Sequence, residues 1–168
     1  FFFHPHAAIR DAQESRGLGD VYKRQIINFT VAPNDKEYSK IPNEDSIAFE
    51  LNSANIFFNE RIQGFDRWEY GNRINYGIQI SHFWGDRVIK ALLAQSYRFS
   101  DLNFSYTGSG LRKNFSDLIF DLFYQPNKYL TITFRGRMTE ADLNLTRSLF
   151  DLQVNFKNWG FRTLLNSI

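Results

Sequence analysis

The chain has 168 residues and a formal net charge of +2, from 20 basic and 18 acidic side chains. This balance gives no field for binding nucleic acid, and the absence of cysteine excludes a disulfide framework and a cysteine-based zinc site. The mean hydropathy of −0.41 and the short apolar runs exclude spanning helices, which need about 18 consecutive apolar residues. The length fits a single domain.

Residues 1–25 do not share the pattern of the rest of the chain. The stretch 10–25, Arg-Asp-Ala-Gln-Glu-Ser-Arg-Gly-Leu-Gly-Asp-Val-Tyr-Lys-Arg-Gln, resembles the translated sequencing-adapter scar found at the ends of many metagenomic reading frames. It contains no apolar run as long as a signal peptide needs. We therefore expect residues 1–25 to be a non-native, unpacked tail and residues 26–168 to carry the fold.

Alternating segments follow one another from residue 26 onward. Residues 26–31 and 46–58 are predicted strands, separated by a polar linker with two prolines. Residues 67–84 alternate most strictly, and they exceed the five or six residues of a usual soluble strand and the roughly 9–11 that cross a bilayer. Their apolar parity holds Trp68, Tyr70, Ile74, Tyr76, Ile78 and Ile80, and their polar parity holds Arg67, Glu69, Arg73, Asn75, Gln79 and Ser81.

Further strands are predicted at residues 87–99, 117–125, 129–138, 145–157 and 161–168. Short connections at 85–86, 126–128 and 158–160 occupy every second junction, and two of the three junctions between them, 59–66, 100–116 and 139–144, are longer. Outer-membrane barrels alternate short periplasmic turns with longer outer loops in this way. We expect the apolar parity to face lipid, including Leu118, Phe120, Leu122, Leu130, Ile132 and Phe134.

The polar parity carries charged side chains on two neighbouring predicted strands. Asp117 and Asp121 are four residues apart on one strand, and Arg135 and Arg137 follow on the next. We expect these four side chains to face a lumen and to oppose one another. A calcium site or an acid/base pair is the less favoured interpretation of the two aspartates.

No side chain is predicted to carry catalysis or to bind a metal. His82 stands alone near a strand end, and residues 108–110, Gly-Ser-Gly, lack the strand–elbow–helix context of a serine nucleophile. The sequence therefore predicts no catalytic residue, no metal site and no cofactor.

Residues 59–77 carry a family resemblance. Their Asn-Glu-Arg, Gly-Phe-Asp-Arg-Trp-Glu, Gly-Asn-Arg and Tyr-Gly groups resemble the "NRF-x-G-x-DR-x-E-x-GNR-x-x-YG" signature of the family of the lipopolysaccharide-assembly outer-membrane protein LptD. Residues 42–46 resemble the short motif that precedes it, and residues 95–99 resemble the later "GQ-x-YRF", although Ala94 replaces the usual glycine and Ile62 a common aromatic. The matching positions are Arg61, Gly64, Asp66, Arg67, Asn72, Arg73, Tyr76, Gly77, Gln95, Tyr97 and Arg98.

The resemblance implies an all-β fold, an antiparallel transmembrane segment of a larger β-barrel in the Gram-negative cell outer membrane. It implies a non-catalytic translocon that receives lipopolysaccharide from periplasmic Lpt bridge proteins and inserts it into the outer leaflet. The implied partners are lipopolysaccharide, an LptE-like plug lipoprotein, the bridge proteins and outer-membrane lipids. The segment alone is not expected to close into a barrel.

Two alternatives stay open from the sequence. A generic porin or receptor barrel would show the same alternation but has no reason to carry the signature. A soluble all-β lipid-binding barrel would turn the apolar parity inward. Strand length and the placement of tyrosine and tryptophan favour the membrane.

The loop at residues 59–67 is expected to serve lipopolysaccharide export by holding the outer rim of the translocon in shape. Gly64 would provide a backbone turn, and Asp66 would accept charge-assisted hydrogen bonds from Arg61 or Arg67. The alternative is that Arg61, Asp66 and Arg67 bind phosphate.

Overall fold

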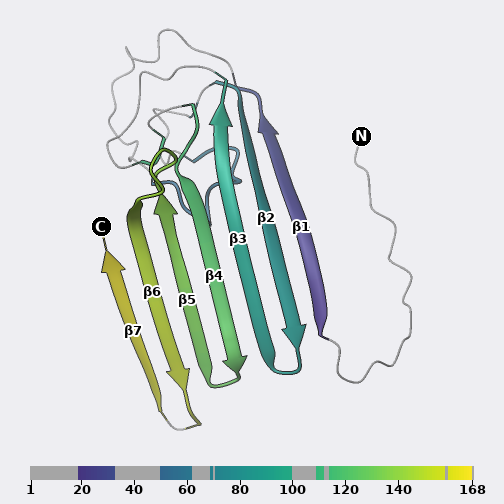
Figure 1. Ribbon diagram of the computed structural model, residues 1–168, viewed down its shortest axis with the longest axis vertical. Helices are drawn as coiled ribbons and strands as arrows, with labels where there is room; N and C mark the ends of the chain where they lie inside the picture. Colours follow the sequence, from purple (N-terminus) through teal and green to yellow (C-terminus); the bar gives the residue numbers. More distant parts are fainter. Residues whose placement is uncertain are drawn as a thin grey trace, which may run out of the picture.

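The computed structural model describes residues 19–32, 50–61, 69, 71–99, 109–111, 114–157 and 159–167. Within these ranges the chain forms one seven-stranded antiparallel sheet in which every strand pairs with its sequence neighbours (Figure 1). The predicted all-β, antiparallel fold is confirmed, and closure into a larger barrel stays a prediction. The strands are β1 (Asp20–Thr30), β2 (Arg73–Trp84), β3 (Arg87–Arg98), β4 (Leu118–Asn127), β5 (Leu130–Met138), β6 (Leu145–Asn155) and β7 (Gly160–Ser167).

No helix in the described part of the chain is long and apolar enough to cross a membrane.

Short connections between the strands gather at one end of the sheet (Figure 1). They join β2 to β3, β4 to β5 and β6 to β7, and we call this end the turn end and the opposite one the loop end. Two of them have only two residues, Gly85 and Asp86 between β2 and β3 and Lys128 and Tyr129 between β4 and β5, and Gly85 has a φ of 58°. The type I′ and II′ turns that are favoured in two-residue hairpins need positive φ, which glycine adopts without a steric penalty. The short connections thus occupy the predicted junctions, shifted by at most two residues.

The cross-strand register separates an apolar face from a polar face. Ile78 pairs with Leu93, and Leu122 with Phe134, so apolar side chains of neighbouring strands meet on one side. Ile78, Leu93 and Leu122 are 53%, 47% and 43% exposed, and Phe134 is partly buried, so the described residues leave much of this face open. The opposite face carries buried polar side chains, namely Arg73, Asn75, Ser81, Ser96, Arg98, Thr133 and Arg137.

The core lies on the polar face, beneath residues 50–61, which we call the strap. Leu51 and Ile56 of the strap are buried against Ala94 of β3 and Ile119 of β4, with Leu111 beside them. The backbone N–H of Leu51 donates to the carbonyl of Ser109 at 3.0 Å. The polar face is therefore covered by chain that does not belong to the sheet.

The strap corrects the prediction of a strand at residues 46–58. Its described part forms turns, because Asn52 Oδ1 accepts hydrogen bonds from the backbone N–H groups of Ala54 and Asn55 at 2.9 and 3.2 Å. Asn55 Oδ1 in turn accepts from the backbone N–H of Asn52 at 2.9 Å, and Ile56 N–H donates to Asn52 O at 3.1 Å. Asparagine side chains thus engage backbone groups that a strand ladder would use.

Two strand beginnings also differ from the prediction. β1 begins at Asp20, so residues 20–25, expected to be unpacked, pair with β2, although their side chains are exposed. Backbone pairing at an open sheet edge does not require a matching side-chain pattern. β2 begins at Arg73 and not at residue 67, because Gly71 has a φ of 86° and interrupts the extended backbone. Trp68 and Tyr70, expected to face lipid, lie outside the described residues.

Candidate functional site

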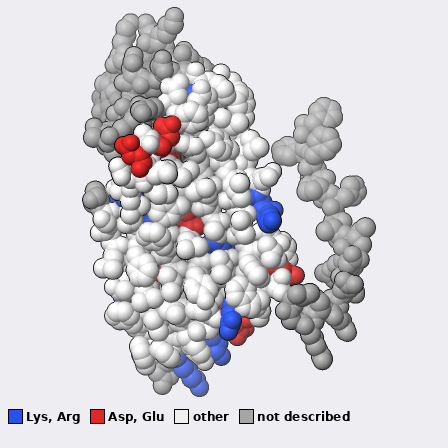
Figure 2. Space-filling view, viewed as in Figure 1, with Lys and Arg blue, Asp and Glu red and all other residues white. Residues whose placement is uncertain are grey.

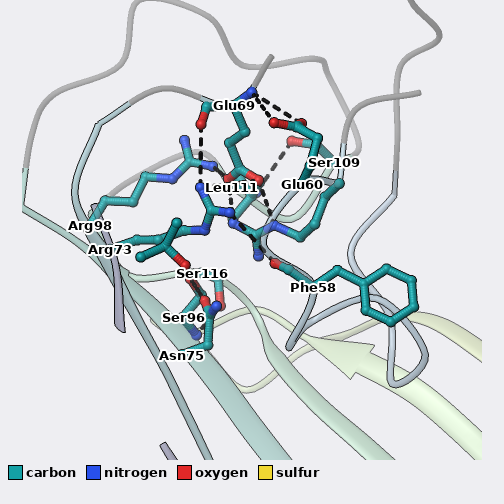
Figure 3. Close-up of polar contacts among 12 residues, drawn as sticks. Phe58, Glu60, Glu69, Arg73, Asn75, Ser96, Arg98, Ser109, Leu111 and Ser116 are labelled. Carbon is teal, nitrogen blue, oxygen red and sulfur yellow. Dashed lines mark hydrogen bonds and ion pairs between the residues drawn. The ribbon is translucent and has the colours of Figure 1, made fainter. Parts of the chain in front are cut away.

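Four charged side chains meet at the loop end of β2 and β3. Glu69 precedes β2, Arg73 begins it, Arg98 ends β3, and Arg61 ends the strap. Arg73 and Arg98 are directly opposite each other in the ladder, so the pairing of β2 with β3 brings them together. We call these four residues the rim cluster, and Figure 3 shows Arg73 and Arg98 reaching toward Glu69.

The Glu69 carboxylate is the shared acceptor of the rim cluster. Arg61 Nε donates to Oε2 at 2.6 Å, and Oε1 accepts from an Nη2 of both Arg61 and Arg98. Arg73 Nη1 lies 3.5 Å from Oε2. None of the four side chains is more than 4% exposed. A buried carboxylate is tolerated only when paired and hydrogen-bonded, and this one has three cationic neighbours.

The rim cluster also binds the backbone of the strap. The Arg73 guanidinium donates to the carbonyl of Asn59 and lies 3.5 Å from that of Phe58. Glu60 accepts a hydrogen bond from the backbone N–H of Glu69, with both carboxylate oxygens 3.1 Å away (Figure 3). The end of the strap is therefore fixed to the start of β2.

The ionisation state of Glu69 follows from two opposed effects. Burial alone would raise the pKa of its carboxyl, but the hydrogen bond from Arg61 and the charges of Arg61, Arg98 and Arg73 outweigh burial and hold the pKa below its ordinary value. Glu69 is therefore ionised at neutral pH. The arrangement is suited to locking chain segments together and offers no nucleophile or proton shuttle.

A second polar layer lies directly below the rim cluster on the same face. Ser96 Oγ donates to Asn75 Oδ1 at 2.6 Å, across the directly opposed pair of β2 and β3. The backbone N–H of Ser96 donates to Ser116 Oγ at 2.9 Å. All three residues are at most 1% exposed, and Figure 3 shows them grouped beneath Arg73.

The Gln95 side chain makes hydrogen bonds at an irregularity in the pairing of β3 with β4. Regular pairing ends at Ala94 and Ile119, and a bridge joins Tyr97 to Phe115, so the β4 side carries one residue more and forms a bulge. Gln95 Nε2 donates to the carbonyl of Ser116 at 3.0 Å, and Tyr76 OH donates to Gln95 Oε1 at 2.6 Å. The Gln95 side chain thus gives the Ser116 carbonyl a hydrogen-bond partner that the strand pairing does not supply. An unpaired carbonyl on this face would be costly in lipid.

Gly77 permits close approach of the strap to β2. A Cβ at this position would lie 2.9 Å from each of Phe57 Cζ, Ala94 Cβ and Leu93 O. Real Cβ atoms do not approach other atoms so closely, so any side chain here would displace the strap or the ladder. This contact explains a glycine in the interior of a long strand.

The strap is anchored at both of its ends across the polar face. Glu50 forms ion pairs with Arg147 and with Arg137, whose Nη1 lies 3.3 Å from Glu50 Oε1. Ser53 Oγ donates to Asp121 Oδ2 at 2.8 Å. At the other end Asn28 Nδ2 donates to the carbonyl of Phe57 at 3.0 Å. The strap therefore reaches from β6 to β1.

The four predicted lumen charges lie together on the polar face. Arg135 Nε is 3.4 Å from Asp121 Oδ2, and Arg137 Nε is 3.1 Å from Asp117 Oδ2. Arg137 is only 7% exposed, with Glu50 of the strap and Gly110 against its side chain, so it is not the solvated side chain that a wet lumen wall predicts. That this face lines a lumen stays a prediction. Within the described ranges, no three His, Cys, Asp or Glu side chains gather in a way that would hold a metal ion.

The remaining signature residues are placed as follows. Asn72 accepts a backbone hydrogen bond from Phe99 at 3.0 Å, and the Tyr97 ring contacts the Phe99 ring with centroids 5.1 Å apart. Gly64, Asp66 and Arg67 lie outside the described residues, and so does the expected pairing of Asp66. Glu69 is the centre of the site, although the sequence pattern predicts no role for it beyond the polar parity. Its position as an acid among the arginines of the signature is the signal that points to it.

These features define the chain as an all-β protein built from one antiparallel meander of long strands, with an open apolar face and a charged network on the other. A family model, LptD: LPS transport system D, matches residues 25–165. The chain therefore belongs to the LptD family, a family of outer-membrane transport components and not of enzymes. Comparison with curated proteins and with solved structures gave no match.

Proposed function

We propose that this chain forms part of the wall of an outer-membrane translocon that inserts lipopolysaccharide into the outer leaflet of Gram-negative cells. Membership of the LptD family supports transport of lipopolysaccharide in general. The observation that carries the proposal is the two-faced sheet, apolar and open on one side and charged on the other. An amphiphile needs both surfaces, because its sugars require a polar path and its acyl chains require lipid.

Aromatic side chains at both ends of the apolar face support a membrane position. Near the loop end the Phe29 and Phe99 rings have centroids 6.0 Å apart, and near the turn end the Phe156 and Trp159 rings have centroids 4.5 Å apart. The strand between these levels, from Ile74 to Trp84, spans about 34 Å, or about 25 Å along the axis of a barrel with its usual tilt. Outer-membrane barrels have an apolar band of about this height between their aromatic girdles.

Both rival interpretations fit less well. A soluble lipid-binding barrel buries its apolar face, whereas here the strap packs on the polar face and leaves Ile78, Leu93 and Leu122 exposed. A generic porin shares the two faces but not the family match.

We further propose the partners that the family resemblance implies. Lipopolysaccharide sugars and an LptE-like plug would meet the polar face, the periplasmic Lpt bridge proteins would supply the substrate, and outer-membrane lipids would cover the apolar face. The charged side chains on the polar face support contact with sugars and phosphates. No cofactor and no catalytic step belong to this proposal.

Photocrosslinking in cells tests the transport function. Leu152 and Gln153 are neighbours on β6, with Leu152 on the apolar face and Gln153 on the polar face. A photoreactive residue at position 153 of the full-length protein should crosslink lipopolysaccharide only while the substrate is supplied. The same group at position 152 should crosslink membrane lipids whether or not transport is running. A position 153 that gives no lipopolysaccharide adduct during active supply would contradict the proposal.

We also propose that residues 1–25 are non-native. In β1, Lys23 lies opposite Ile80 and Gln25 opposite Ile78, so two polar side chains occupy the apolar face. Ile27 and Phe29, which follow, restore the apolar pattern. A lysine at membrane depth is destabilising, which argues against selection of this stretch as part of the wall. Sequencing the genomic locus across residue 25 tests the proposal, and recovery of the same codons would refute it.

A further inference from the structure

Two hairpin turns at the turn end place a cation over an aromatic ring. Arg87 follows the β2–β3 turn, and its guanidinium carbon lies 6.0 Å from the centroid of the Trp84 ring. Lys128 lies in the β4–β5 turn, and its Nζ is 5.1 Å from the centroid of the Tyr129 ring. Both cations are exposed. Each turn therefore presents one positive charge beside one aromatic side chain.

The third hairpin turn has the same composition. Lys157 stands between Phe156 and Trp159, and all three are exposed. The Phe156 ring has its centroid 4.5 Å from that of Trp159 and stacks on Tyr129 of the neighbouring turn at 5.7 Å. A continuous aromatic row thus joins two of the turns. A cation next to an aromatic residue thus recurs in all three hairpin turns, and in two of them the cation lies over the ring.

The charge of the three hairpin turns is opposite to that of the exposed turn at the loop end. Across residues 85–87, 126–129 and 156–159 there are three cations and one acid, Asp86. The β5–β6 turn at residues 139–144 carries Glu140 and Asp142 and no cation. Figure 2 shows blue atoms gathered at the turn end, at the bottom of the view, and red atoms at the upper left.

We propose that the turn end binds the phosphate headgroups of anionic phospholipids in the leaflet that it faces. The inference rests on the proposed function, because it presupposes that the sheet lies in a membrane. Exposed tyrosine and tryptophan favour the level of the headgroups, and lysine and arginine reach from there to phosphate oxygens. Each cation near an anionic surface should raise lipid affinity roughly fivefold. The three turns together form one basic, aromatic rim that matches an anionic leaflet.

A photoreactive phosphatidylglycerol in vesicles, with the full-length protein inserted, tests this surface locally. Adducts are mapped by mass spectrometry to the peptides that contain residues 84–87, 128–129 and 156–159. Unlabelled phosphatidylglycerol should compete with these adducts roughly fivefold better than phosphatidylcholine at each turn. The triple variant Arg87→Gln, Lys128→Gln and Lys157→Gln should lose that difference.

Two further variants and one extraction step make the outcomes distinct. Asp86→Asn should strengthen the preference for phosphatidylglycerol, and Arg162→Gln, which removes an exposed cation from the polar face, should leave it unchanged. Equal competition by the two lipids in a protein that resists alkaline extraction would overturn this inference and leave the proposed function standing. A protein that alkaline extraction removes from the vesicles would overturn the proposed function, and the inference with it.

Discussion

Arg61 and Glu69 form an ion pair from which solvent is excluded. Arg61 Nε donates to Glu69 Oε2 at 2.6 Å, and both side chains are 0% exposed. The pair joins the end of the strap to the loop end of β2, and Arg98 brings the end of β3 to the same carboxylate. One acidic side chain thus holds three segments that are separate in the sequence. Its loss should affect the rim as a whole.

Replacement of Glu69 by glutamine should destabilise the protein strongly. The change keeps the size of the side chain but leaves the buried guanidinium groups around it without their shared charge, and breaking a buried pair in this way costs about 3–5 kcal/mol. Denaturant titration of the full-length protein in detergent measures the free energy of unfolding. Glu140→Gln, in an exposed turn, is the matched control and should change it by less than about 0.5 kcal/mol. Equal losses at the two positions would contradict the assigned role of the rim cluster.

The same variant separates a folding role of the rim from a transport role. If the rim only supports folding, Glu69→Gln should lower the amount of folded protein while surface lipopolysaccharide per folded barrel stays normal. If rim shape serves export, that ratio should also fall. Quantifying surface lipopolysaccharide and heat-modifiable protein in the same cells gives the ratio. We expect the ratio to fall, in line with the proposed role of the loop at residues 59–67.

The stabilisation by Glu69 should depend on pH in one direction. Its pKa is lowered in the folded protein, so its contribution is fully present above the ordinary carboxyl pKa of about 4.3 and is lost as the pH falls through the lower folded value. The difference in unfolding free energy between wild type and Glu69→Gln should therefore be constant from pH 8 to pH 5 and shrink below about pH 4. Unfolding titrations of both proteins across this range provide the check. A difference that grows on acidification would show that the pKa is raised instead.

The strands can be predicted from the sequence, whereas the conformation of the strap cannot. Alternation over Ile74, Tyr76, Ile78 and Ile80 predicts β2 and its apolar face, because a period of two is a local property of the backbone. Residues 46–58 also begin with alternating residues, but the Asn52 side chain accepts hydrogen bonds from the backbone N–H groups of Ala54 and Asn55, and the described part of this segment forms turns. Alternation of apolar and polar residues does not reveal that a side chain competes with strand pairing for backbone hydrogen bonds.

The rim cluster depends on register, which a single strand does not reveal. Arg73 and Arg98 belong to the signature, but they meet at Glu69 only through the pairing of β2 with β3 and the return of the strap to the same edge. Gln95 also belongs to the signature, but its hydrogen bond to the carbonyl of Ser116 depends on a bulge that follows from the β3–β4 register. The sequence therefore does not predict which polar side chains from different strands meet.

Substitution of Gly77 should be more damaging than substitution of Gly85. An alanine Cβ at position 77 would meet Phe57, Ala94 and the backbone oxygen of Leu93 at 2.9 Å, and overpacking of this kind costs about 1–3 kcal/mol. At Gly85 a Cβ has open space around it, so only the positive φ of 58° is unfavourable, at about 1 kcal/mol. Unfolding free energies of Gly77→Ala and Gly85→Ala in the full-length protein give the comparison. A smaller loss at position 77 would mean that the strap does not pack on β2.

Adjacent leucines on β7 provide the sharpest test of which face meets lipid. Leu165 lies opposite Phe150 on the apolar face and is 63% exposed, while Leu164 lies opposite Asp151 on the polar face and is 52% exposed. In water the two positions are equivalent, so arginine at either would have a similar, small effect. In a membrane, Leu165→Arg should cost about 2–4 kcal/mol near the midplane, whereas Leu164→Arg should cost little because it meets a hydrated face beside a carboxylate. Unfolding of both variants of the full-length protein from vesicles measures the difference, and equal costs at the two neighbours would contradict the assignment of the apolar face to lipid.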